Sequence, residues 1–406
     1  MKQKIFLLSA LLIPLLNFAS EYENVAKLMT ADNTFAFKLL KELNAENKSG
    51  NLFVSPYSAA TALQMAANGA SGQTKAEMQK VLETAGLTRE ELNAASKAAG
   101  ALLNSPDTNI ILTTANALWY RQGAEIRPEF VAENLIFFTS TIKPLDFANV
   151  PAAEAAINQW ASDQTHGRIT GIADGAISAE TGFILANAIY FKGKWKDLFD
   201  PKLTKDRIFH PATGAGKKVP MMEMSNHFTY RQGSGYQVVR LPYTDGELGM
   251  YVFLPARGSS LTNLLNSMNG DNWWTMGIRG HRSAYGPLFG TSIGHLVLPK
   301  FKIGSDLKLN APLKALGMKA AFDASKADFS GMFSEPLFIS KVRQKTFMEA
   351  GEEGTEAGAT TLVRGTYGAP EAPPKPFEMI VDRPFLFAIV DARSEMILFM
   401  GVVNEL

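Results

Sequence analysis

The chain has 406 residues, of which 46% are hydrophobic and 19% are charged, the ordinary composition of a globular protein. Its 40 basic and 39 acidic residues leave a net charge of +1. Because the sequence also has no dense run of lysine or arginine, we expect no nucleic-acid partner. The absence of cysteine excludes thiol catalysis and thiolate metal sites.

The N-terminal segment 1–20 has the pattern of a secretory signal. Lys2 and Lys4 precede an apolar run from Ile5 to Leu16, and two small residues end the segment. The run is too short for a comfortable membrane span, and no later stretch approaches about 18 uncharged apolar residues. We therefore predict a signal peptide at 1–20 and a protein that is secreted, periplasmic or at the cell surface. The alternative is a buried N-terminal helix.

Helical patterns dominate the first half of the chain. The stretch NTFAFKLLKEL places Phe35, Leu39 and Leu43 on one face, and Asn33 or Thr34 is the expected N-terminal cap. Two further pairs have the spacing of a capping box and predict helix starts: Thr74 with Glu77, and Thr88 with Glu91.

From about residue 182 onward, strand patterns dominate. Segments such as FILANAIYF, GMYVFLP and MILFMGVV are rich in β-branched and aromatic residues. In RPFLFAIV the residues that would point to one face of a strand and those that would point to the other are both apolar. We therefore expect a strand that is buried on both faces. Helices and strands do not alternate strictly, which favours the α+β class over a doubly wound sheet. The Gly-rich stretch 279–294 is predicted to be a surface loop.

A search for catalytic patterns finds no enzyme. The sequence has neither a His-Glu-x-x-His run nor a Gly-x-Ser-x-Gly elbow, and PATGAGKKV lacks the first glycine and the Ser/Thr of a phosphate loop. We therefore expect no catalytic site, no metal and no cofactor. None of the five histidines lies four residues from another: His166, His210, His227, His281 and His295.

Residues 351–376, GEEGTEAGATTLVRGTYGAPEAPPKP, form an unusual segment between two apolar strands. The segment has no helical period and few large side chains, and it ends in a proline cluster. Composition alone is typical of a flexible linker. The sequences on both sides of it change this interpretation.

The start of this segment and the sequences around it resemble those of serpins, the serine protease inhibitor superfamily. EEGTEAGATT resembles the hinge of the family's reactive loop, VDRPFLFAI the signature that follows the loop, and ILFMGVVN the C-terminal strand. NLFVSPYSAATAL, NALWY, INQWASDQTHGRI, NAIYFKGKW and LPKFKI resemble further serpin segments in the same order. The resemblance runs from about residue 30 to the C-terminus.

The resemblance implies one domain over residues 21–406. Its fold would have about nine helices, three β-sheets and an exposed reactive loop at about 352–376. In inhibitory serpins a protease cuts this loop and forms an acyl-enzyme, which is trapped when the hinge inserts into the main sheet as a new strand. We therefore expect a monomeric suicide inhibitor that forms a covalent complex with a serine protease, or with a cysteine protease as the second target class. The alternative is a non-inhibitory serpin that acts as a binding or carrier protein.

The hinge sequence is able to become a central strand. Every second residue from Thr355 is small and uncharged, which suits entry into a packed interior. The charged Glu356 falls on the opposite face. The residues assigned to the hinge by resemblance are Glu352, Gly354, Thr355, Glu356, Ala357, Gly358, Ala359, Thr360 and Thr361.

The cleavage site has two candidate positions. Family spacing from Gly354 places it near Gly368–Ala369, whereas counting back from Pro384 places it near Pro373. Prolines from Pro370 onward cannot donate ladder hydrogen bonds, which favours the earlier position.

The residues near the earlier position leave the target specificity open. Tyr367 would suit a chymotrypsin-like pocket and Arg364 a trypsin-like one. The predicted reactive-site region is Arg364, Thr366, Tyr367, Gly368 and Ala369.

Two control regions follow from the resemblance. Trp195, in FKGKW, resembles the tryptophan of the breach, the end of the main sheet where insertion begins. Ser55, Ser58 and Asn187 match polar positions of the shutter, beneath the middle of the sheet, where the family usually adds a histidine. The matching residue here is Gln344, which can donate and accept hydrogen bonds but cannot become charged.

Overall fold

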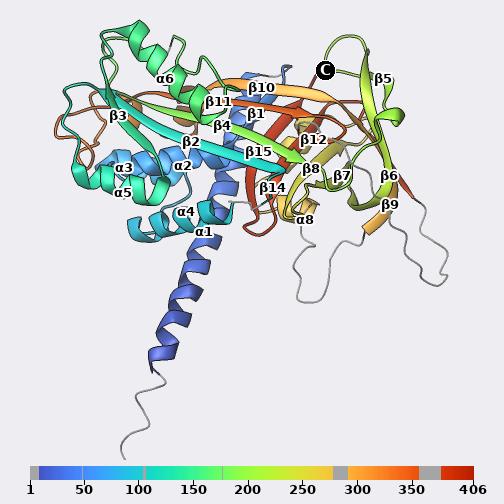
Figure 1. Ribbon diagram of the computed structural model, residues 1–406, viewed down its shortest axis with the longest axis horizontal. Helices are drawn as coiled ribbons and strands as arrows, with labels where there is room; N and C mark the ends of the chain where they lie inside the picture. Colours follow the sequence, from blue (N-terminus) through green and yellow to red (C-terminus); the bar gives the residue numbers. More distant parts are fainter. Residues whose placement is uncertain (1–8, 48, 104–106, 176, 278–290, 356–375) are drawn as a thin grey trace, which may run out of the picture.

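The structure is a computed structural model, and it describes residues 9–47, 49–103, 107–175, 177–277, 291–355 and 376–406. Two β-sheets form the centre of the molecule, and helices flank them (Figure 1).

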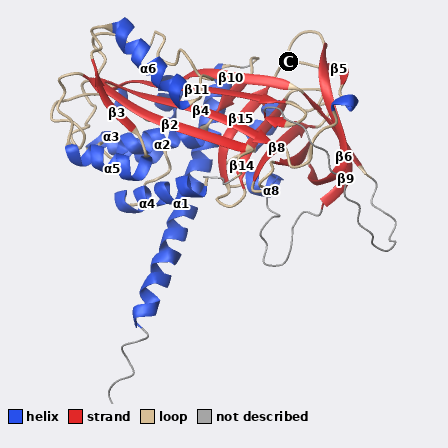
Figure 2. Cartoon of the chain, in the orientation of Figure 1, coloured by secondary structure: helices blue, strands red, loops and turns tan. Residues whose placement is uncertain are grey.

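The described residues form nine α-helices and two short 3₁₀ helices, most of them in the first half of the chain. Figure 2 shows these helices in blue beside the strands in red. Three of these described α-helices follow residue 200. The helices are α1 (Ser9–Glu46), α2 (Pro56–Ala67), α3 (Gly72–Val81), α4 (Arg89–Leu102), α5 (Pro128–Phe138), α6 (Val150–Gln164), α7 (Leu261–Ser267), α8 (Trp273–Gly277), α9 (Asn310–Leu316), η1 (Pro201–Leu203) and η2 (Ala320–Phe322).

The first sheet, which we call the main sheet, has six strands. Its two central neighbours β4 and β11 run parallel, and β2 pairs antiparallel with β4 on the other side. A short strand, β12, pairs with the last residues of β4. The order is β10 (Phe301–Lys308), β11 (Ile339–Ala350), β4 (Phe183–Lys194), β2 (Ile110–Arg121) and β3 (Thr141–Leu145), with β12 (Gly354–Thr355) beside β4.

The second sheet has nine strands and contains the C-terminal hairpin. Its order is β1 (Leu52–Val54), β15 (Met396–Val403), β14 (Phe385–Asp391), β8 (Leu248–Pro255), β7 (Tyr236–Pro242), β6 (Lys217–Gly233), β9 (Thr291–Pro299) and β13 (Phe377–Ile380), with β5 (Lys205–Phe209) paired to β6.

The α+β fold class is confirmed, but the described strands join into two sheets where three were expected. The cause is β6, a strand of 17 residues. Its first part pairs with β5 and β9, and its last part, from Thr229 onward, pairs with β7. One long strand therefore links two groups of strands that would otherwise count as separate sheets.

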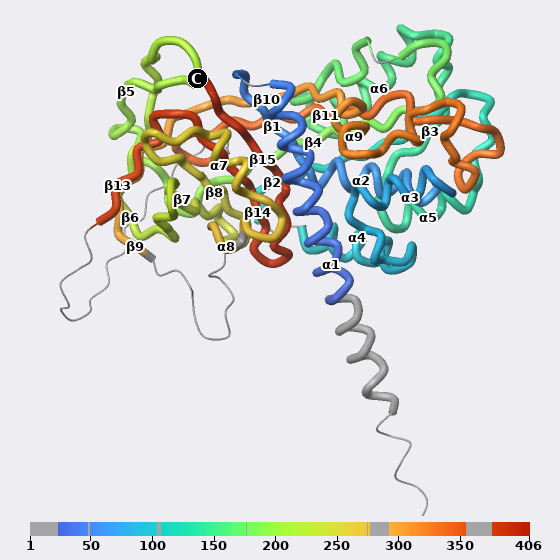
Figure 3. Tube along the Cα trace, turned by 180° about the vertical axis from the view of Figure 1, so that it is seen from behind, coloured from blue at the N-terminus to red at the C-terminus, as the bar shows by residue number. Residues whose placement is uncertain are grey.

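The main sheet is covered on both faces. Helices α1 and α2 lie behind it, as the reverse view shows (Figure 3), and α2 contacts both β2 and β4. On the opposite face, Ile157 and Trp160 of α6 pack against Trp119 and Ala186 of the sheet. This double burial explains why β4 is almost continuously apolar. The C-terminal strand β14 is also buried along its whole length, as predicted.

The cap expected at Asn33 or Thr34 is wrong, because both residues lie inside the longer helix α1. Asn33 instead fixes α1 to the last hairpin. Its side chain donates to the carbonyl of Glu395 and accepts from the amide of Ile397, both at 3.0 Å. Thr34 donates to the carbonyl of Thr30 one turn earlier.

Of the two expected capping boxes, only one forms. Thr88 and Glu91 make a capping box at the start of α4, as predicted. Thr74 and Glu77 do not, because α3 begins at Gly72. The Glu77 carboxylate instead accepts hydrogen bonds from the backbone at the start of η2.

Two further expectations change. Strands β1, β2 and β3 lie in the half predicted to be mainly helical, and β2 is central to the main sheet. Of the stretch 279–294, residues 279–290 lie outside the described residues and 291–294 begin β9 instead of a loop.

The N-terminal signal peptide stays a prediction. The described backbone is helical from Ser9 through the end of α1. None of the helices in the described part of the chain is long and apolar enough to span a membrane.

Candidate functional site

The site lies along the seam between β4 and β11. These strands pair in parallel register from Phe183 opposite Ile339 to Tyr190 opposite Phe347. Beyond Tyr190 the partner of β4 on this side changes to β12, which runs antiparallel to β4, with Gly354 opposite Lys194. The chain therefore begins to occupy the seam where the direct pairing of the two long strands ends.

At this end of the seam, Trp195 anchors the backbone beside the start of the predicted hinge. Its ring is 1% exposed and stacks on Tyr243, with ring centroids 4.7 Å apart. Its indole nitrogen donates to the carbonyl of Gly351 at 2.9 Å, and its backbone amide donates to the carbonyl of Glu353 at 2.9 Å. The tryptophan expected at the breach thus holds the backbone on both sides of Glu352, the first residue of the predicted hinge.

Glu352 adds an ion pair to these contacts. Its carboxylate lies 2.8 Å from the ammonium of Lys300 on the loop before β10 and accepts a hydrogen bond from the hydroxyl of Thr204 at 2.9 Å. Burial alone would raise the pKa of the Glu352 carboxyl. The hydrogen bonds from Lys300 and Thr204, with the charge of Lys300, outweigh that burial and hold the pKa below its usual value.

Gly354 needs to be glycine for two reasons. Its φ of +134° is in a region that residues with a side chain rarely adopt. A Cβ atom at this position would lie 2.2 Å from the carbonyl oxygen of Gly193 on β4. Only a residue without a side chain can bring the hinge backbone this close to the sheet.

The four predicted shutter residues form one buried hydrogen-bond network. Gln344 accepts from the amide of Ser55 at 2.9 Å and donates to the carbonyl of Ser55 at 2.8 Å and to the Asn187 side chain at 2.7 Å. Asn187 donates in turn to the hydroxyl of Ser58. All four residues are at most 2% exposed. The network ties the start of α2 to both strands of the seam.

Sequence reasoning missed a fifth member of this network, Asn116 on β2. Its side-chain oxygen accepts from Asn187 at 2.7 Å. Asn116, Asn187 and Gln344 are register partners, so the three amides form one row across β2, β4 and β11. A polar residue inside the apolar strand NALWY was the available signal. Lys300 and Thr204 carried no such signal, because ordinary surface residues look the same.

Part of the predicted site lies outside the described residues. These positions are Glu356, Ala357, Gly358, Ala359, Thr360 and Thr361 of the hinge, and Arg364, Thr366, Tyr367, Gly368 and Ala369 of the reactive-site region.

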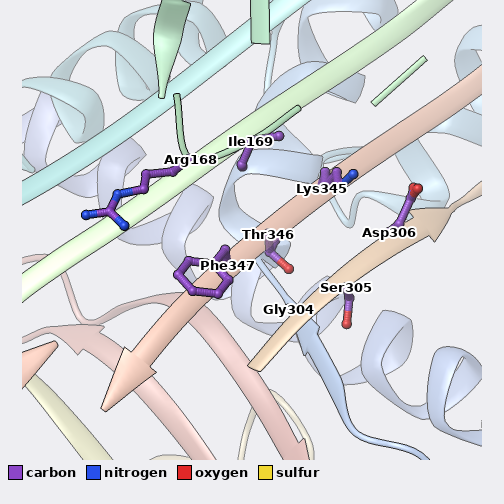
Figure 4. A pocket seen from close by; sticks show the side chains of 8 residues that line it. All are labelled: Arg168, Ile169, Gly304, Ser305, Asp306, Lys345, Thr346 and Phe347. Atoms are coloured by element: carbon purple, nitrogen blue, oxygen red, sulfur yellow. The ribbon is translucent and has the colours of Figure 1, made fainter. Parts of the chain in front are cut away.

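A small pocket of about 280 Å³ opens on the main sheet beside the seam (Figure 4). Its lining includes Lys345 and Phe347 of β11, Asp306 of β10, and Arg168 and Ile169 from the chain after α6. Asp306 is the one acidic residue in the lining and pairs with Arg343. A pair of carboxylates for acid–base chemistry is therefore not part of this lining. Among the described residues, no three His, Asp or Glu side chains are grouped to hold a metal ion.

Comparisons with known proteins agree with this geometry. The family model described as "Serpin (serine protease inhibitor)" matches residues 30–406. An uncharacterised serpin-like protein of Thermococcus kodakarensis is 35% identical, covering 92% of this chain and 84% of its own. The leukocyte elastase inhibitor of Sus scrofa is 34% identical, covering 93% and 99%.

Solved structures give the same result. Human thyroxine-binding globulin, solved in complex with its thyroxine ligand, has a TM-score of 0.82 at 26% identity, covering 94% of this chain and 99% of its own. The family match spans nearly the whole chain, and the relatives align over most of their length. The chain therefore belongs to the serpin family, whose members include protease inhibitors.

Proposed function

We propose that this protein is a secreted suicide inhibitor of a serine protease, with cysteine proteases as a second target class. The observation that supports this most strongly is β12, which already pairs antiparallel with β4 at the end of the seam. A strand that grows from β12 would lie between β4 and β11 and run antiparallel to both. This pairing supports the proposal because the predicted hinge could extend into the seam from β12.

The register of β12 predicts how far such a strand could extend. Thr355 lies opposite Gly193. Because the pairing is antiparallel, each residue further along the hinge would lie opposite a residue one position earlier in β4. Thr361 would then reach Asn187, and Gly365 would reach Phe183, the first residue of β4. This length fits before Pro370 and leaves the bond between Gly368 and Ala369 just beyond the end of the strand, which favours cleavage there.

The same register assigns the faces of the inserted strand. Thr355, Ala357, Ala359 and Thr361 would share the side of β4 that carries Asn187 and faces α2. This side is fully packed, so small side chains are needed there. The pattern seen in the sequence thus agrees with the face that the register selects.

The driving force would come from the ladder of the main sheet. A strand between β4 and β11 pairs on both of its sides, whereas the native seam has one ladder between the same two strands. Each additional backbone hydrogen bond contributes about 0.5–1.5 kcal/mol net. The inserted state would therefore be more stable than the native one by the gain of one ladder.

In the proposed reaction the protease nucleophile attacks the carbonyl of the residue before the cut, and the new amine leaves with the C-terminal part of the loop. The acyl-enzyme that remains is covalently attached to the hinge. Insertion then carries the protease away from the breach and distorts it before water can complete hydrolysis. The binding of Glu352 and the backbone beside Trp195 keeps one end of the moving strand fixed.

The test is a search for a covalent complex that survives denaturing electrophoresis, using chymotrypsin and trypsin as probes. In the variant Ala359→Arg a long charged side chain would enter the packed face opposite Ile189, so we expect the complex to vanish and cleavage to continue. Glu356→Gln, on the opposite face, is the control and should keep the complex. Proteases that all nick the wild-type loop and stay active would contradict the proposal.

The alternative function is that of a non-inhibitory binding or carrier protein. The structural likeness to thyroxine-binding globulin favours considering it. A carrier would show no marked rise in thermal stability after cleavage of the loop, whereas an inhibitor would. Measuring the unfolding temperature of the cleaved and the intact protein separates the two.

A further inference from the structure

Asp32 links three helices behind the main sheet. It lies in the middle of α1 and is 4% exposed. Its Oδ1 accepts a hydrogen bond from the Gln64 amide of α2 at 2.8 Å, and the Gln64 oxygen accepts from the hydroxyl of Ser96 on α4 at 3.3 Å. One chain of side chains therefore joins α1, α2 and α4.

The other carboxyl oxygen of Asp32 is buried and has no hydrogen-bond partner among the described residues. A buried carboxylate oxygen without a donor disfavours the charged form of the group. Burial accordingly raises the pKa of Asp32 to about 8, although the hydrogen bond from Gln64 opposes this shift. The carboxyl is thus mostly neutral at pH 7.

Within the part of the chain that the structure describes, no basic side chain pairs with Asp32. On α2 the neighbour is Tyr57, whose pKa is raised by burial and by the charge of Asp32. On α1 itself, Lys27 pairs with Glu23. On other elements, Glu91 accepts a hydrogen bond from the amide of Thr88 at the start of α4, Lys97 lies over the ring of Phe137, and Arg393 pairs with Asp391, the last residue of β14.

Helix α2 connects this cluster to the shutter. Ser55 caps α2 and Ser58 lies in its first turn, and both belong to the network that joins β4 to β11. Gln64 lies further along the same helix. The contact with Asp32 therefore helps to fix the helix that holds the shutter.

We propose that Asp32, when protonated, stabilises the packing of α2 against α1 and α4. The neutral carboxyl holds α1, α2 and α4 together, and loss of its proton places an uncompensated charge between them and loosens the packing. This device does not depend on whether the protein inhibits a protease.

The sign of the effect follows from the two states of the carboxyl. In the unfolded chain Asp32 loses its proton near pH 3.8, whereas in the native protein it keeps the proton up to about pH 8. Between these values the contribution of Asp32 to stability falls as the pH rises, by about tenfold in the unfolding equilibrium constant per pH unit. Above about pH 8 the Asp32 carboxyl is ionised in both states, so its contribution to stability no longer changes with pH.

The test compares urea unfolding of the wild type and of Asp32→Asn at pH 5 and pH 8. Asparagine keeps the acceptor for Gln64 but cannot ionise. We expect the stability advantage of the variant over the wild type to grow by a factor of about a hundred or more in the equilibrium constant between the two pH values. An advantage that stays the same at both values would overturn the proposal.

Two controls accompany this test. Asp163→Asn removes an exposed carboxylate from α6 and should show no such growth. A direct titration of the Asp32 carboxyl carbon by NMR in the wild type needs no variant to fold. A midpoint near pH 8 supports the proposal, and a midpoint near pH 4 refutes it.

Discussion

The breach and the shutter hold the same seam by different means. At the breach, the hinge is fixed by backbone hydrogen bonds to Trp195 and by the ion pair of Glu352 with Lys300, whose side chain is 40% exposed. At the shutter, neutral amides and hydroxyls satisfy one another in the interior. The contacts at the breach should therefore weaken in acid and in high salt. The shutter network itself contains no ionisable side chain and should respond to neither, apart from the contact of α2 with Asp32, which is strongest when the carboxyl is protonated.

The largest effect is expected from Gln344→Leu, which removes the amide without a large change of volume. It leaves the backbone of Ser55 and the side chain of Asn187 without their buried partner. We expect a loss of about 3 kcal/mol or more in the free energy of unfolding, because each buried unpaired group costs about 1–3 kcal/mol. Urea unfolding measures this loss.

A second substitution at this position tests whether the neutral shutter residues leave stability independent of pH. Gln344→His restores the residue usual in the family. Burial should lower the pKa of that histidine, so the variant should lose stability as the pH falls below about 6.5. A wild-type protein that loses stability in the same way below about pH 6.5 would contradict the difference between the two regions.

The next effect concerns the hinge backbone at the breach. Gly354→Ala would push a Cβ atom against the carbonyl of Gly193 and strain φ, so we expect the hinge to detach from β4. The free energy of the contact between the hinge and β4 should fall by about 1–3 kcal/mol, the usual size of such strain. Faster proteolysis near residue 354 measures the detachment. Gly351→Ala is a matched control, since a Cβ there would meet its nearest neighbours only at 3.9–4.0 Å.

The two regions also differ in how far sequence could predict them. The shutter positions came from resemblance. The structure brings all four together because the strand register places Gln344 opposite Asn187, and the start of α2 places Ser55 and Ser58 beside them. Asn116 was missed although its polar side chain in an apolar strand was a visible signal, because the sequence does not show that this strand lies beside β4. Lys300 escaped because an ion pair across long sequence distances depends on packing that no local pattern encodes. The sheet count changed for a similar reason, since only pairing reveals that β6 spans two groups of strands.

The smallest effect is expected from Glu352→Gln, which removes the charge but keeps the shape. Its partner Lys300 is partly exposed, so the pair should contribute about 1 kcal/mol or less, and added salt should reduce that further. Because the native pKa of Glu352 lies below its unfolded value, its contribution is present above about pH 4.5 and is lost as the pH falls through the lowered pKa. The wild type should therefore approach the variant in stability under acid, and Lys300→Met should behave as Glu352→Gln does. A difference from the wild type that persists in acid and in high salt would contradict a role for the charge of Glu352, and the breach would then depend on neutral hydrogen bonds as the shutter does.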